Sequence, residues 1–139
     1  MSRVIKFRAW DIVNSVMIYE SYNDDHYILT IEQCKPVLLE YAGDDYARYV
    51  EIDSEIQQFT GFSDDDGKDC YEGDIVHSSY GIPGRVIESL VYFENGQFMT
   101  RCISDKVTSP QICSLSEFCM HLGQFWIIGN KFENPELIK

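Results

Sequence analysis

The chain is poor in basic residues. Of its 139 residues, 11 are Lys or Arg and 23 are Asp or Glu, which gives a formal net charge of −12 at pH 7. A surface this acidic repels a phosphate backbone and an anionic membrane, so we expect neither nucleic acid nor a membrane as a partner. The same charge favours a partner protein with a basic face, although acidity can also serve solubility alone.

Long apolar runs and paired cysteines are missing as well. No stretch approaches the roughly 20 apolar residues that a membrane-spanning helix requires. Charged and aromatic residues interrupt the basic N-terminal segment, so it does not resemble a signal peptide. The count of cysteines is odd and no Cys-x-x-Cys pair is present; they are Cys34, Cys70, Cys102, Cys113 and Cys119. We therefore expect reduced, mostly buried thiols in a cytoplasmic protein.

The short motifs that carry common chemistry are also absent. There is no Gly-x-Ser-x-Gly elbow, no Walker loop and no Gly-x-Gly-x-x-Gly fingerprint. Residues 64–69, Asp-Asp-Asp-Gly-Lys-Asp, suggest a calcium loop. However, placing Gly67 at the sixth position of an EF-hand puts Phe62 and Gly73 where carboxylates must stand. We expect a solvated turn there, and no cofactor.

Cysteine and histidine offer little more. Cys113, Cys119 and His121 are close in sequence, but a structural zinc ion needs about four ligands at workable spacing. His26 and His77 stand in unrelated contexts, and no nucleophile and base are paired by the sequence. We therefore expect no metal site and no catalytic residues, which predicts that the protein is not an enzyme.

The sequence does contain a series of short, strand-like segments joined by turn residues. Strands are expected at 4–9, 16–19, 27–31, 48–52, 55–60, 75–77, 85–93, 97–103 and 125–128. Asn95-Gly96 is a strong hairpin signal, and a bulge is expected near Ser89. Residues 32–41 leave the end of the third strand ambiguous, because they could form a short helix broken at Pro36.

Two short helices and a compact core complete the expected structure. Ser114 or Ser116 can cap a helix that runs to Leu122 and ends at Gly123. Pro135 can begin a final helical turn. Four large aromatic residues are expected in the core: Trp10, Phe93, Phe125 and Trp126.

These elements indicate a mainly β protein. Residues from about 54 onward supply enough strands for an SH3-like small barrel, preceded by an N-terminal β-hairpin extension and accompanied by one or two short helices. We expect a β-rich N-terminal lobe at 1–53 and the barrel at 54–139, which includes the C-terminal Asn-Pro-Glu-Leu tail. The two parts could also form one compact unit.

The acidic turn and the residues after it are the candidate interaction site. Asp64, Asp65 and Asp66 precede a tight turn that begins with Tyr71 and Glu72, and we expect these five residues along an exposed edge. The alternative is that both turns are purely structural. A further candidate is the group of tyrosines in the first 50 residues: Tyr19, Tyr22, Tyr27, Tyr41, Tyr46 and Tyr49. Such a group suits a protein-binding or self-association surface. The alternative is that these tyrosines simply pack in ordinary strands.

Blocks at both ends and in the middle resemble the YopX family of phage and prophage proteins. The blocks are KFRAWD at 6–11, QFTG at 58–61, DGK at 66–68, YEGDIV at 71–76, IGN at 128–130 and ENPEL at 133–137, together with Met17 and Tyr19. Residues 20–55 match least, and Cys70 stands where the family is usually aliphatic. The resemblance implies a phage or prophage origin, a location in the bacterial host cytoplasm, and a β-rich, SH3-like barrel without assigned activity.

Three hypotheses about function follow. The first is an accessory phage protein that binds a host or phage protein through an acidic, Tyr-rich surface, in host takeover or counter-defence. The second is a small-ligand binder or nucleotide sponge, which would require convergence of Arg3, Arg8, Arg48, Arg85 and Arg101. The third is a Cys- and His-dependent enzyme. A homo-oligomer formed through exposed strand edges is compatible with the first.

Overall fold

The computed structural model describes residues 4–19, 26–43, 49–79, 86–103, 112–122 and 124–138. It divides into two compact units, residues 1–59 (unit 1) and 60–139 (unit 2). The division falls inside strand β6 (Ser54–Ser63), whereas the sequence placed the boundary at the start of this strand. Some residues named above lie outside the described ranges: Arg3, Tyr22, Tyr46, Arg48, Arg85 and Gly123.

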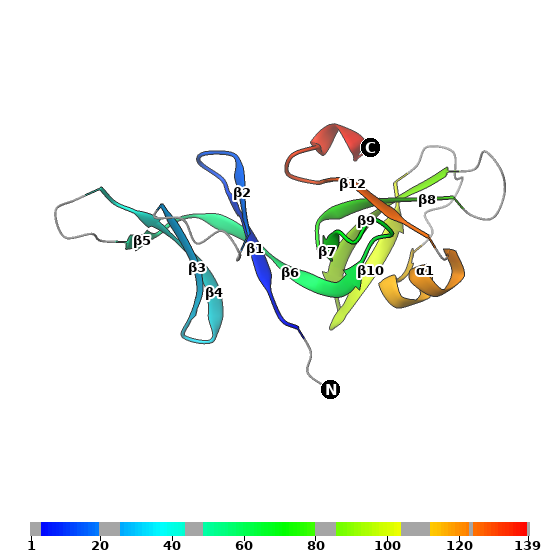
Figure 1. The fold of residues 1–139 in the computed structure, drawn as a ribbon, viewed down its shortest axis with the longest axis horizontal. Coiled ribbons are helices and arrows are strands. Elements are labelled where there is room, and N and C mark those ends of the chain that lie inside the picture. Colours follow the sequence, from blue (N-terminus) through cyan, green and yellow to red (C-terminus); the bar gives the residue numbers. More distant parts are fainter. Residues whose placement is uncertain are drawn as a thin grey trace. The chain divides into compact units, whose positions relative to one another are not determined.

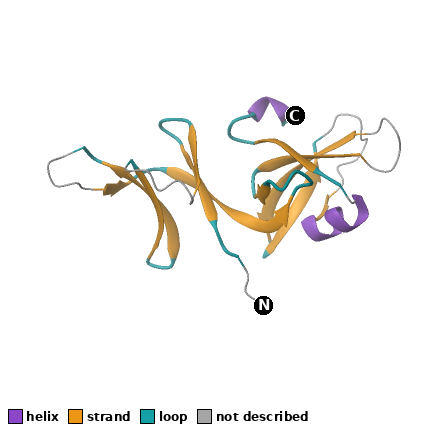
Figure 2. Cartoon of the chain, viewed as in Figure 1, coloured by secondary structure: helices purple, strands orange, loops and turns teal. Residues whose placement is uncertain are grey.

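Unit 1 opens with the predicted hairpin. Strands β1 (Phe7–Asp11) and β2 (Val16–Tyr19) pair antiparallel, with Asp11 opposite Val16 where the connecting turn begins. β1 also pairs antiparallel with β6, so that Phe7 faces Gln58 and Asp11 faces Ser54. β1 therefore lies between β2 and β6 in the order of the strands. Figure 1 labels the three strands, and Figure 2 gives the same view with strands in orange. The hairpin predicted for the start of the chain is confirmed.

A second sheet in unit 1 decides the conformation of residues 32–41, which the sequence left open between the end of a strand and a short helix: the segment is not helical. These residues form strand β4 (Lys35–Tyr41), which pairs antiparallel with β3 (Tyr27–Glu32) and with β5 (Tyr49–Glu51). A two-residue turn of Gln33 and Cys34, with φ of 49° and 67°, joins β3 to β4. Pro36 has no N–H to donate to a neighbouring strand. It is tolerated because β5 pairs only with residues 39–41 and so needs no hydrogen bond from position 36.

Burial explains why residues 35–41 are extended. The fully buried side chain of Leu38 packs with Ala9, Ile18, Tyr27 and Leu29 in the core of unit 1. Burying a leucine of this kind contributes about 2 kcal/mol, which outweighs a weak local preference for helix. The conformation of this segment is therefore decided by its packing partners.

Unit 2 contains a five-stranded antiparallel sheet in the order β11-β10-β9-β8-β12. Its strands are β8 (Asp74–Ser79), β9 (Val86–Glu94), β10 (Gln97–Cys102), β11 (Ile112–Ser114) and β12 (Trp126–Asn130). Strand β7 (Asp69–Tyr71), helix α1 (Leu115–Leu122) and the 3-10 helix η1 (Pro135–Leu137) complete the unit. The sheet curls like a half-barrel (Figure 1), which confirms the mainly β class and is consistent with an SH3-like barrel.

Of the local features predicted from the sequence of unit 2, a turn and a helix cap are confirmed and a bulge is not. Asn95 and Gly96 form the predicted tight turn, with φ of 51° and 78°. Ser114 caps α1, because its Oγ accepts a hydrogen bond from the N–H of Glu117 (3.1 Å). The bulge predicted near Ser89 is wrong: β9 pairs regularly with both neighbours, and the register shifts instead on β12, between Ile127 and Gly129.

Two apolar clusters cover the two faces of this sheet. On one face, Val76 and Val91 pack with Phe118 and Phe125; the full cluster is Cys70, Val76, Val91, Leu115, Phe118 and Phe125. On the other face, Ile75 and Leu90 pack under the C-terminal segment; the full cluster is Ile75, Leu90 and Ile103. Phe125 is in the core as predicted. The prediction is wrong for Phe93, which is 50% exposed, and Ile128, in the strand expected at 125–128, is 39% exposed.

The turn after β12 is organised by two asparagines. The buried Asn130 accepts hydrogen bonds at its Oδ1 from the N–H groups of Phe132 (3.0 Å) and Glu133 (2.9 Å). In return, Asn134 accepts the N–H of Asn130 at its Oδ1 (3.2 Å). Gly129 leaves room for this contact, since a Cβ there would lie 2.3 Å from that oxygen.

Replacing Gly129 with Ala should therefore destabilise unit 2 by about 1–3 kcal/mol, because the added methyl displaces the Asn134 amide. Chemical unfolding followed by tryptophan fluorescence measures the loss. The matched control is Gly129→Ala in an Asn134→Ala background, where the clash with the amide is absent and only the contact with the Cβ of residue 134 at 3.2 Å remains, so the same substitution should have a smaller effect. Equal losses in both backgrounds would show that this contact is not the reason for the glycine.

Candidate functional site

The acidic turn between β6 and β7 is built around the side chain of Asp64. This carboxylate is buried, and its Oδ1 accepts hydrogen bonds from the N–H groups of Asp66 (3.0 Å) and Lys68 (2.8 Å). Its Oδ2 accepts a third from the N–H of Ile127 on β12 (3.0 Å). Hydrogen bonds to a charged acceptor are stronger than neutral ones. One side chain thus shapes the turn and ties it to the neighbouring strand.

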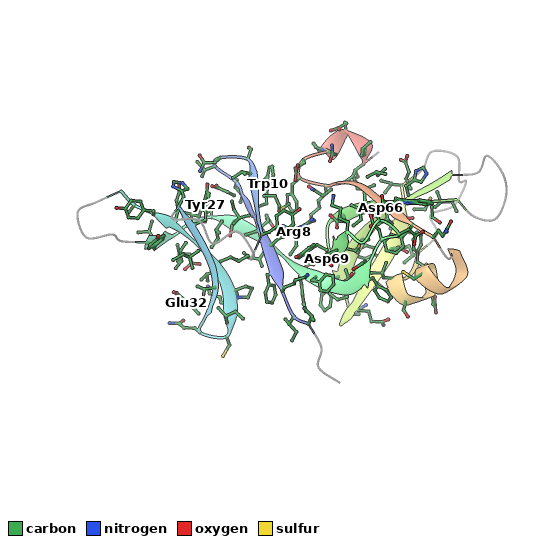
Figure 3. The ribbon with its side chains drawn as sticks, viewed as in Figure 1. Arg8, Trp10, Tyr27, Glu32, Asp66 and Asp69 are labelled. Carbon is green, nitrogen blue, oxygen red and sulfur yellow. The ribbon has the colours of Figure 1, made fainter. Side chains whose placement is uncertain are left out.

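The five residues predicted as an interaction edge separate into an inner and an outer set. Asp64 and Tyr71 are buried, so the expectation that Tyr71 lies on an exposed rim is wrong. Asp65 and Asp66 are exposed, and Glu72 is half-buried; Figure 3 labels Asp66. Binding through the outer set stays a prediction.

The second predicted turn, residues 71–74, has the same construction. The Oδ2 of the buried Asp74 accepts a hydrogen bond from the N–H of Tyr71 (2.8 Å). Gly73 has a φ of +89°, donates its N–H to the carbonyl of Val91 (2.7 Å) and accepts from the N–H of Lys131 (2.9 Å). The turn is therefore confirmed as a structural element, fixed to β9 and to the residue that follows β12.

A buried polar cluster in unit 1 was not predicted from the sequence. Asp11 is fully buried at the end of β1, and its Oδ2 accepts hydrogen bonds from the Tyr27 hydroxyl (2.7 Å) and from Asn14 Nδ2 (2.7 Å). Its Oδ1 accepts from the N–H groups of Val13 (3.0 Å) and Asn14 (3.2 Å). The spacing of Asp11 and Asn14 in a turn was a usable signal, but nothing local indicates Tyr27, which comes from another strand.

The environment of this cluster fixes the protonation of both partners. Burial by itself raises the pKa of Asp11, but the hydrogen bonds from Asn14, Tyr27 and the backbone outweigh it and lower the pKa below its usual value. Burial, followed by the hydrogen bond and charge of Asp11, raises the pKa of Tyr27 to about 12. At neutral pH the carboxylate therefore accepts and the phenol donates.

Arg8 is the second buried charged residue of β1. Its Nε donates to Gln57 Oε1 on β6 (2.8 Å), and its guanidinium lies 6.0 Å from the centre of the Tyr19 ring. Figure 3 shows Arg8 on β1 and Tyr27 on β3. Because the guanidinium is already inside the protein, Arg8 is not displayed as an anion-binding group.

The tyrosines of the first 50 residues are more buried than a binding surface requires. Tyr27 is buried in the core of unit 1, and Tyr19, Tyr41 and Tyr49 are half-buried. The rings of Tyr41 and Tyr49 lie on paired strands with their centres 5.6 Å apart. Strand packing therefore accounts for the placement of these four.

The cysteines differ in their exposure to solvent. All five cysteines are free; Cys34 is exposed, Cys70 is buried, and the other three are half-buried. Burial, with the charge of Asp65 and then Cys113, raises the pKa of Cys119 to about 11, so this thiol is protonated at neutral pH. Within the described residues, no three or more His, Cys, Asp or Glu side chains form a group that could hold a metal ion.

Comparisons with known proteins place the chain in a family. A model of the YopX protein family matches residues 6–139, so the chain belongs to this family. No curated protein matches it. In the part of the chain that the structure describes, no helix has the length and apolar character needed to cross a membrane.

Two solved structures share the fold over nearly the whole chain. Protein EF1440 from Enterococcus faecalis is 24% identical with a TM-score of 0.54, and the match covers 99% of this chain and 100% of that one. Protein yopX from Bacillus subtilis is 18% identical with a TM-score of 0.62, covering 96% and 98%. At these identities the likeness concerns the fold alone.

The role of Asp64 leads to a first prediction for this site. Asp64→Ala should destabilise unit 2 by about 2–4 kcal/mol, because the backbone donors that it satisfies lose their acceptor. Asp65→Ala removes an exposed carboxylate from the same turn and should change the stability by less than about 0.5 kcal/mol. Urea unfolding of both variants tests this, and similar losses for the two would contradict the assigned role.

The Asp11–Tyr27 pair leads to a pH prediction. A raised pKa in the folded state means that the stability contributed by Tyr27 is fully present below its ordinary pKa of 10.0 and is lost as the pH rises through about 12. The wild type should therefore exceed Tyr27→Phe in stability by about 2 kcal/mol near neutral pH. This difference should shrink between pH 10 and 12. Urea unfolding at a series of pH values measures it, and a constant difference would contradict the pairing.

Proposed function

We propose that this YopX-family protein is a non-catalytic binding module that recognises a basic face of a host or phage protein through the exposed carboxylates of its acidic turn. The observation that carries the proposal is that the aspartates of that turn have two different roles. Asp64 is inside and fixes the backbone, whereas Asp65 and Asp66 are exposed. Their charges are therefore held in place before a partner arrives, which limits the entropy lost on binding.

The charge of the whole chain supports a basic partner. A formal net charge of −12 creates a long-range field that attracts cationic surfaces and accelerates their association. The exposed turn would supply the local contacts with the partner, and the long-range field would steer the partner toward the protein. An accessory role for a phage or prophage in the host cytoplasm, as in host takeover or counter-defence, is a natural setting for such a module.

The described residues favour binding over the other two hypotheses. A nucleotide sponge needs arginines that converge on phosphates, but Arg8 is buried against Gln57. A Cys- and His-dependent enzyme needs an activated thiol, and Cys119 has its pKa raised. A role for tyrosines in the binding surface receives less support, because Tyr19, Tyr27, Tyr41 and Tyr49 pack within the strands of unit 1.

Charge reversal in the turn tests the proposal. Tagged Asp65→Lys/Asp66→Lys protein and wild type are used to capture partners from a lysate of a bacterium that carries the gene. The expected result is one strongly enriched protein that is lost with the double variant. Its affinity for the wild type, measured after purification, should fall steeply with added salt.

The matched control is Glu94→Lys/Glu136→Lys, which makes the same change in net charge at two exposed carboxylates elsewhere in unit 2. It should retain the partner. If both double variants lose the partner equally, only the overall charge matters; if neither does, the turn is not the binding site. Either result would overturn the proposal as stated.

A further inference from the structure

The loop between β1 and β2 displays apolar side chains where a turn usually displays polar ones. Val13 is 77% exposed, Ile12 is 50% exposed, and Val16 at the start of β2 is 39% exposed. Turns favour Gly, Pro, Asn, Asp and Ser for conformational and hydrogen-bonding reasons that isoleucine and valine do not share. These three residues, called here the hairpin tip, leave between 39% and 77% of their surface in contact with solvent.

The hairpin tip is nevertheless held in one shape from inside. The buried carboxylate of Asp11 accepts the N–H groups of Val13 and Asn14 and the side-chain amide of Asn14. The Tyr27 hydroxyl donates to the same carboxylate, and the N–H of Ser15 donates to the Asp11 carbonyl (2.9 Å). A loop fixed by its own buried network loses little conformational entropy on binding.

The surroundings of the hairpin tip are acidic. β6 runs beside β1 with Glu55 opposite Trp10 and Ser54 opposite Asp11, and both Glu55 and the neighbouring Asp53 are exposed. The one basic residue of β1, Arg8, is buried. The exposed surface therefore combines a protruding apolar tip with carboxylates at its side.

We propose that the hairpin tip inserts into an apolar pocket of another protein whose rim carries Lys or Arg. Charge complementarity selects this occupant: a cationic rim pairs with Glu55 and Asp53, whereas a second copy would bring two chains of −12 together. An anionic bilayer surface is disfavoured for the same reason. This surface belongs to unit 1, so the inference does not depend on the acidic turn of unit 2.

The first experiment is photocrosslinking with the full chain. A benzoylphenylalanine is incorporated at Val13, and in a separate variant at Ile31, an aliphatic residue of unit 1 that is 58% exposed on β3. Both variants are expressed in a bacterium that carries the gene and irradiated. The expected result is a crosslink to one other protein from position 13 and none to that protein from position 31.

The second experiment measures the affinity of the crosslinked protein, once purified, for the wild type and two variants. Ile12→Ser/Val13→Ser should weaken binding roughly ten- to a hundred-fold, because two aliphatic anchors are lost. Ile31→Ser should leave the affinity unchanged. Urea unfolding of each variant separates a loss of binding from a loss of folding.

Three results would overturn the proposal: no crosslink from position 13, a crosslink to a second copy or to lipid, or an equal loss of affinity in the two serine variants. None of these results would affect the acidic-turn proposal, because that proposal is tested by substitutions at Asp65 and Asp66. The two proposals can therefore be tested independently of each other.

Discussion

Buried aspartates that accept backbone hydrogen bonds hold the turns of this protein in place. Asp11 does so in unit 1, and Asp64 and Asp74 do so in unit 2. A turn leaves N–H groups that no β ladder pairs, and a buried N–H without an acceptor destabilises the fold. A carboxylate with two oxygens can satisfy several of these donors at once. The same arrangement fixes the exposed neighbours of each aspartate, and in two of the three turns those neighbours are the surfaces proposed to bind.

The residues that carry the family resemblance mostly have structural roles. Asp11, Asp74, Gly129 and Asn130 satisfy hydrogen bonds or leave space for them. The residues of the hairpin tip and Asp65 stand outside the matching blocks, whereas Asp66 of the acidic turn stands inside one. A fixed scaffold with surfaces particular to each member is a common route to function. Likeness in fold to other members of the family therefore need not imply a shared partner.

Two hairpin turns of the same kind illustrate what could be predicted. Asn95 and Gly96 both adopt positive φ at little strain, so the dipeptide indicated its turn from the sequence alone. Gln33 and Cys34 adopt the same conformation without such a preference, and the second turn was missed, together with strand β4. The side chain of Leu38 decides that region by packing into the core of unit 1. The inner position of Asp64 was unpredictable for a related reason, since one of its donors, the N–H of Ile127, belongs to a distant strand.

The mainly β class, the turns at Gly67, Gly73 and Asn95-Gly96, a helix cap at Ser114 or Ser116 and the acidic character could be predicted from the sequence alone, because each depends on residues close together in the chain or on composition. The packing of distant strands was needed to show which aspartates are buried, that Tyr71 and Arg8 are buried as well, and which apolar residues remain exposed. Burial and hydrogen bonding between distant strands depend on which segments meet, and a linear pattern carries no information about the partner that will supply the missing donor or acceptor.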